Sequence, residues 1–95
     1  MELRFTAPVF SWRGPAPHHF VRLPDDDAAV VQDVARAVTY GWGMVPVTVT
    51  LGATTWTTSL WPKDGSYAVP LKLWVRRAEG VELGDEIDVA LTIDV

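Results

Sequence analysis

Imidazole chemistry in this chain is confined to two adjacent residues, His18 and His19. Histidine suits proton transfer near neutral pH, so either residue could serve as the general base of a small enzyme. Neighbouring residues on a strand point to opposite faces, so both rings could bind one metal ion only from a loop. No third ligand lies at a standard spacing, and we expect no metal site here.

Three consecutive aspartates, Asp25 to Asp27, form the other cluster that could bind a divalent cation. They follow Pro24 at the start of an expected helix, where a carboxylate accepts amide hydrogens and matches the positive end of the helix dipole. No glycine and distal glutamate follow at the spacing of a calcium loop. We interpret these residues as a helix cap, and we expect neither a metal nor another cofactor.

Nucleophilic and phosphate-binding motifs are missing from the sequence. Ser59 could in principle act with a histidine and an aspartate, but the Gly-x-Ser-x-Gly turn that exposes a serine nucleophile is absent. The Gly41-Trp42-Gly43 segment is too short for a phosphate loop and lacks its lysine. The absence of cysteine excludes disulfide scaffolds, thiolate zinc sites and cysteine nucleophiles.

The strongest candidate for a contact surface is a basic helix near residue 75. Lys72, Arg76 and Arg77 are expected to face away from the apolar side of that helix, and Leu73 projects between the two arginines. The simpler interpretation is a solvated face, since positive charge stabilises a helix C-terminus and single exposed leucines are common. The functional interpretation is a small amphipathic patch for an acidic ligand or a partner segment.

The five tryptophans are many for this length, and each can bury about 150–250 Å². We expect Trp56 and Trp74 to lie in the core, because they share a face with other apolar residues of their elements. Trp12, Trp42 and Trp61 adjoin proline or glycine near strand ends. We expect one of these three to be exposed, and we place Trp12 and Trp61 beside the basic helix in the contact surface.

Alternation of apolar and polar residues predicts the strands that position these side chains. In the first strand Leu3, Phe5, Ala7 and Val9 share one face. The predicted strands cover residues 2–10, 19–23, 45–51, 53–61, 67–69 and the segment from 87 to the C-terminus.

Two amphipathic helices complete the predicted elements. The first opens at the aspartates and ends at Gly41, where a left-handed residue is usually required. The second spans 71–79, with Pro70 in its first turn and Gly80 at its end. Its predicted apolar face is Leu71, Trp74, Val75 and Ala78.

These elements predict a mainly β fold of the α+β class in one domain over residues 1–95. Strands with one apolar face must close on themselves or pack against helices. A small closed or double-split six-stranded β-barrel with two short helices, one at each open end, satisfies this requirement. The chain has 95 residues and is 48% apolar, which argues against a second core and against disorder.

The charge balance limits the partners of this barrel. Eight basic residues oppose twelve acidic ones, for a net charge of −4, and residues 78–95 hold six acidic residues and no basic one. A duplex nucleic-acid binder usually needs a basic stripe, so we expect no nucleic acid as partner. No apolar run has the length of a signal peptide or membrane span, which favours a cytoplasmic protein without membrane contact.

Several longer motifs resemble one small bacterial family. They are Gly41-Trp42-Gly43, Val45-Pro46-Val47-Thr48-Val49, Thr55-Trp56-Thr57-Thr58-Ser59-Leu60-Trp61-Pro62, Gly65-Ser66-Tyr67-Ala68-Val69-Pro70-Leu71-Lys72, Val75-Arg76-Arg77-Ala78-Glu79-Gly80 and Gly84-Asp85-Glu86-Ile87. Phe5, Trp12, Phe20-Val21 and Leu23-Pro24 precede them in the expected order. Over nearly its whole length the chain is similar to the DUF1905 type of bacterial domain of unknown function. The resemblance implies a double-split β-barrel and implies no activity, substrate or catalytic residue.

Three functions follow as hypotheses. The first is a non-enzymatic binding or interaction module for a small molecule or a protein segment, acting as a monomer or weak homodimer. The second is a small enzyme or ligand-converting domain that uses His18 or His19 as a base. The third is a DNA-binding dimer, by analogy with regulators built on similar barrels.

Overall fold

The computed structural model describes residues 1–12, 18–38 and 43–94, and for Trp12, His18 and residues 36–38 it describes the backbone only. The elements are β1 (Glu2–Trp12), β2 (His18–Arg22), α1 (Asp25–Val38), β3 (Val45–Leu51), β4 (Thr54–Lys63), β5 (Ser66–Leu71), α2 (Leu73–Glu79) and β6 (Glu86–Thr92). The predicted helix end at Gly41 and the side chain of Trp42 lie outside the described residues. Among the described residues, no helix has the length and apolar character needed to span a membrane.

Six strands close into a barrel in the order β1-β2-β5-β4-β3-β6, and each neighbouring pair is antiparallel. β1 changes partner along its length, since residues 2–8 pair with β6 and residues 9–12 pair with β2. β4 does the same, since residues 54–60 pair with β3 and residues 61–63 pair with β5. The predicted six-stranded barrel is confirmed, and two of its strands are divided between two sheets.

Apolar side chains from all six strands fill the barrel interior, as the alternation predicts. Val49, Leu60, Val69 and Val89 have no exposed surface, and Trp56 is 5% exposed, which confirms its predicted place in the core. The buried residues of β1, β3 and β6 are Phe5, Ala7, Val9, Val45, Val47, Val49, Leu51, Ile87, Val89 and Leu91. These residues form one continuous apolar cluster in the interior of the barrel.

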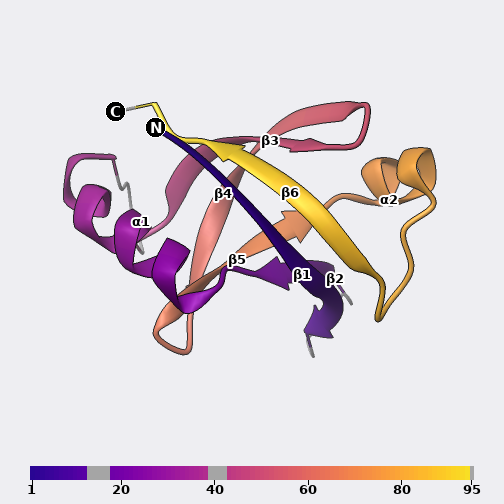
Figure 1. Ribbon diagram of the computed structural model, residues 1–95, viewed down its shortest axis with the longest axis horizontal. Helices are drawn as coiled ribbons and strands as arrows, with labels where there is room; N and C mark the ends of the chain where they lie inside the picture. The colour runs from indigo at the N-terminus through magenta and orange to yellow at the C-terminus, as the bar shows by residue number, and fades with distance from the viewer. Residues whose placement is uncertain (13–17, 39–42, 95) are drawn as a thin grey trace.

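The helices lie at opposite ends of the set of strands (Figure 1). α1 buries Ala28, Val31 and Ala35 against the core, and α2 buries Val75. Met1 lies beside Ile93, which follows β6. The Met1 amino group donates to the Ile93 carbonyl at 2.7 Å, and the Ile93 amide donates to the Met1 carbonyl at 2.8 Å. The prediction of two short helices beside the barrel is confirmed, and they lie on opposite sides of the strands.

The start of the second helix was predicted incorrectly. Pro70 and Leu71 belong to β5, where they pair with Phe20 and His19, and α2 begins at Leu73. Proline is tolerated in a strand where no neighbour needs its missing N–H. β5 pairs with β4 only over residues 66–68, so at Pro70 the strand has a partner on one side only.

Candidate functional site

The seven-residue helix α2 presents a strip of exposed side chains to solvent. Leu73, Trp74, Arg77 and Ala78 are all exposed, and the first two retain 50% and 53% of their accessible surface. Residues three and four apart on a helix are neighbours, so these four side chains form one continuous surface. We call this surface the α2 outer strip.

The opposite side of α2 is held against the barrel by one apolar and several polar contacts. Val75 is fully buried. The Arg76 Nε donates to the Leu71 carbonyl at 3.3 Å, and the Thr54 hydroxyl donates to Glu79 Oε2 at 2.6 Å. Just before the helix, Lys72 Nζ donates to the Thr57 carbonyl at 3.3 Å. These contacts fix the rotation of α2 about its own axis and hold the outer strip toward solvent.

This rotation corrects the predicted apolar face of the helix. Trp74 and Ala78 were expected to face the core, but both are exposed. Leu71, expected on the same face, is buried as part of β5. The contacts of Arg76 and Glu79 with the ends of the strands turn the helix so that only Val75 enters the core.

The structure brings only part of the predicted contact surface together. Lys72, Leu73 and Arg77 are exposed on or beside α2, whereas Arg76 is half-buried on its inner side. Trp61 is 37% exposed, but it lies on the outer wall of the barrel in β4. The side chain of Trp12 lies outside the described residues.

An aromatic cluster on the outer wall of the barrel contains Trp61. Its ring centroid lies 5.5 Å from that of Phe20, which in turn stacks on Phe10 at 6.0 Å. Phe20 is 1% exposed although it is not part of the interior cluster, which takes Val21 instead. Sequence analysis missed this cluster, and the signal for it was the position of Phe10 and Phe20 on the strand faces opposite Val9 and Val21.

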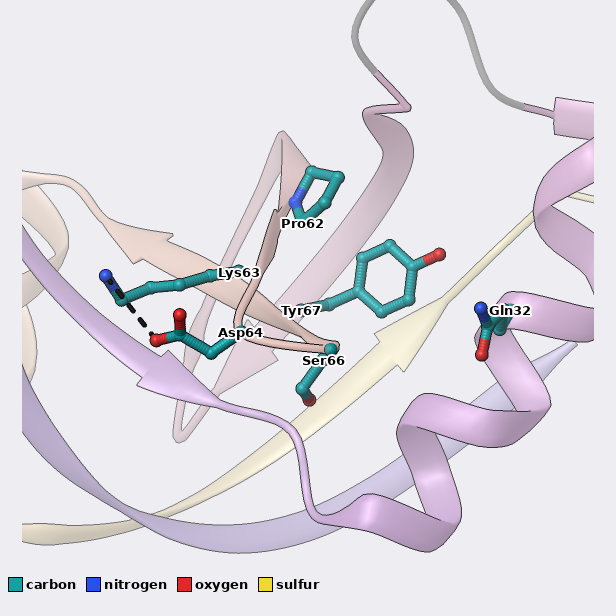
Figure 2. A pocket seen from close by; sticks show the side chains of 7 residues that line it. Gln32, Pro62, Lys63, Asp64, Ser66 and Tyr67 are labelled. Carbon is teal, nitrogen blue, oxygen red and sulfur yellow. Dashed lines mark ion pairs between the residues drawn. The ribbon is translucent and has the colours of Figure 1, made fainter.

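The turn between β4 and β5 borders a groove of about 290 Å³. Asp64 and Gly65 both have positive φ, the conformation of a tight two-residue hairpin. Figure 2 shows the Tyr67 ring extending toward Gln32 of α1, with Lys63 and Asp64 on the other side of the groove and their charged atoms 3.9 Å apart. Burial raises the pKa of the Tyr67 hydroxyl, which therefore stays a neutral donor. The groove also carries the Lys63 ammonium group and the Asp64 carboxylate, whose charges oppose each other.

His19 is half-buried near the α2 end of the barrel, on the strand position that pairs with Leu71. Its Nδ1 atom is buried and has no hydrogen-bond partner among the described residues. Burial lowers the pKa of the imidazole, and the Arg76 guanidinium lowers it further. A general base needs a partner that orients it, and among the described residues none bonds to Nδ1 of His19. The side chain of His18 lies outside the described residues.

Replacing His19 with glutamine is expected to reduce the acid sensitivity of the fold. The folded-state pKa lies below the usual 6.5, so as pH falls the unfolded chain takes up a proton first and stability is lost. Urea unfolding at about pH 7.5 and about pH 5 should show a larger loss for the wild type than for His19→Gln. Equal losses of stability in the two proteins would contradict the assignment of a lowered pKa to His19. In an NMR titration, Arg76→Gln should raise the pKa of His19, because it removes the neighbouring positive charge.

The three aspartates that were considered as a cation site occupy the first turn of α1. Their charge there matches the positive end of the helix dipole. Asp25 also lies 3.9 Å from Arg22, with 92% of its side chain exposed. Within the described ranges, no three His, Cys, Asp or Glu side chains are grouped as a metal site would require.

The sequence matches the model of a known protein family. No curated protein matches the chain. The model of a family described as a domain of unknown function, DUF1905, matches residues 5–91, which run from the first half of β1 to nearly the end of β6. The match therefore includes every strand of the barrel and both helices, and the chain belongs to the DUF1905 family.

Proposed function

We propose that the protein is a non-enzymatic binding module that holds an acidic, amphipathic segment of a partner protein against the α2 outer strip. The observation that supports this proposal is the exposure of Leu73 and Trp74 beside Arg77, on a helix whose other side is fixed to the barrel. A fixed helix can bind a partner without first becoming ordered, which reduces the entropy lost on association.

The apolar part of the strip supports a protein partner. Exposed tryptophan and leucine side chains next to each other are unfavourable in water, and burying apolar surface releases about 25 cal/mol per Å². Tryptophan is also enriched among the residues that contribute most to binding in protein interfaces. We therefore assign Trp74 as the central contact residue and Leu73 as its neighbour.

The charge of the strip determines the kind of partner. Arg77 lies in the strip and Lys72 precedes it, whereas the chain as a whole carries a net charge of −4. A basic patch on an acidic protein attracts acidic segments and repels basic ones. An amphipathic segment with glutamate or aspartate around its apolar residues matches both properties of the strip.

Trp74→Ala is expected to weaken the binding of a short amphipathic peptide of leucine and glutamate at least about tenfold. It should change the free energy of unfolding by less than about 1 kcal/mol, because Trp74 is largely exposed. Isothermal titration calorimetry measures the binding, and chemical denaturation measures the stability. Leu83→Ala is the matched control, since Leu83 is 54% exposed outside α2.

Reversing the charge at Arg77 should reverse the charge preference of the α2 outer strip for its peptide. Arg77→Glu should weaken the leucine–glutamate peptide and strengthen a matched leucine–lysine peptide. Failure of the wild type to bind the acidic peptide, or equal effects of Trp74→Ala and Leu83→Ala, would contradict the proposed function.

A further inference from the structure

A second groove, of about 510 Å³, opens in the barrel wall where β1 separates from β2. The last β1–β2 pair on this side is Val9 with Val21. Pro8, the next residue of β1, has no N–H for a further β2 contact and instead pairs with Glu86 of β6. The change of partner leaves a gap between the strands, and its volume is in the range of about 300–1,000 Å³ that small-molecule sites occupy.

The floor and one wall of this groove are apolar and held in place. Ala7 and Leu23, both members of the interior core, line the floor. The Phe10 ring forms part of the wall and is fixed from behind by Phe20, with centroids 6.0 Å apart and ring planes 29° from parallel. A flat apolar group can therefore enter the groove and stack on Phe10 without rearranging the barrel.

The rim of the groove carries two cationic side chains, Arg22 and Lys63. Arg22 Nη2 lies 3.4 Å from the Asp64 carbonyl and 3.9 Å from Asp25 Oδ1, and Lys63 Nζ lies 3.9 Å from Asp64 Oδ2. The Asp25 and Asp64 side chains are 92% and 79% exposed. Both ion pairs are long, the Arg22 side chain is 48% exposed and the Lys63 side chain 25%, so an incoming anion competes with exposed carboxylates for two cations that the barrel already holds in place.

We propose that this groove binds a small molecule in which one carboxylate is attached to a flat apolar body. The apolar body lies on Phe10 and over Leu23, and the carboxylate lies between Arg22 and Lys63. Arginine is suited to this role because its planar guanidinium binds both oxygens of a carboxylate. The site is separate from the α2 outer strip, so either proposal can fail without the other.

The test is an NMR titration of the ¹⁵N-labelled protein with 3-phenylpropanoate and, in parallel, with its uncharged amide. We expect saturable shifts of the Thr6, Phe10, Arg22 and Leu23 amides with the carboxylate, and binding at least about tenfold weaker for the amide, as the loss of a charged partner predicts. Equal binding of both compounds, or shifts that map to another surface, would overturn the proposal.

Variants at the rim give predictions of both signs. Asp64→Asn removes a competing carboxylate and should strengthen 3-phenylpropanoate binding several-fold, and asparagine tolerates the φ of 50° at this position. Arg22→Gln should weaken binding about tenfold or more, since it removes the charged donor. Arg4→Gln, a charge change on an exposed residue of β1 that does not line this groove, is the control and should leave the affinity unchanged. An unchanged affinity in both Asp64→Asn and Arg22→Gln would contradict the assigned carboxylate position.

Discussion

Replacing Phe20 with alanine is expected to lower the free energy of unfolding by about 3–5 kcal/mol, as for a large core aromatic residue. Phe20 lies on the outer face of β2, yet it is 1% exposed because Phe10 and Trp61 pack against its ring. Chemical denaturation followed by far-ultraviolet circular dichroism measures the change. The expected result means that the barrel is stabilised from outside its wall as well as from its interior.

Phe10→Ala is the control for Phe20→Ala, because it also removes an aromatic ring from the cluster on the outer wall. Phe10 is only half-buried, so Phe10→Ala should be less destabilising than Phe20→Ala. A loss below about 1 kcal/mol for Phe20→Ala, typical of a surface position, would show that the outer cluster does not stabilise the fold.

Gly52→Ala is expected to lower the free energy of unfolding by about 2–4 kcal/mol through two effects. Gly52 has a φ of 58° in the turn between β3 and β4, a conformation that is strained for alanine. A Cβ atom there would also displace the Glu79 carboxylate, which accepts the 2.6 Å hydrogen bond from Thr54. The substitution therefore strains the turn and breaks the Thr54–Glu79 contact, one of the contacts between α2 and the barrel. Chemical denaturation measures the sum of the two effects.

Gly65→Ala is the matched control for the strain alone. Gly65 has a φ of 75°, and apart from its two chain neighbours no described residue has a heavy atom within 4 Å of the position that its Cβ would take. In a protein that already carries Glu79→Ala, the loss of unfolding free energy caused by Gly52→Ala should fall to about that caused by Gly65→Ala. The reason is that the Thr54–Glu79 hydrogen bond is already absent there. Equal effects of the two glycine changes in the wild type would contradict a structural role for the Thr54–Glu79 contact.

The strands and their inward faces could be predicted because a half-buried strand alternates with period two. The interior positions of β3, from Val45 to Leu51, and of β6, from Ile87 to Leu91, follow directly from that rule. The barrel then follows, since six strands with one apolar face each bury that face by closing on themselves.

The orientation of α2 could not be predicted from periodicity. A tryptophan at helical spacing from Val75 indicates a buried side chain, but Trp74 is 53% exposed. The rotation of this short helix is fixed by polar contacts to distant residues, Thr54 in particular, and helical periodicity carries no information about them. Pro70 led to the incorrect prediction that the helix begins at Leu71. Pro70 instead lies in β5, which can hold a proline there because its pairing with β4 stops before this residue.

The groove at β1 was out of reach of sequence analysis for a similar reason. It exists because β1 changes partner at Pro8 and Val9, and strand partners far apart in the sequence are not visible in local patterns. Lys63 and Arg22 come together there only through the pairing of β2 and β4 with β5. The exposure of Lys72, Leu73 and Arg77 could be predicted because it depends on one short segment of the chain, whereas the inward position of Arg76 could not.

The most direct test of the central claim, that partners bind the exposed face of α2 outside a filled barrel, is an amide-by-amide NMR titration with the leucine–glutamate peptide. We expect the largest shift changes at Leu73, Trp74, Arg77 and Ala78, with the interior amides of Val49 and Leu60 unchanged. Largest changes at the interior amides, or none at α2 at saturation, would contradict the claim.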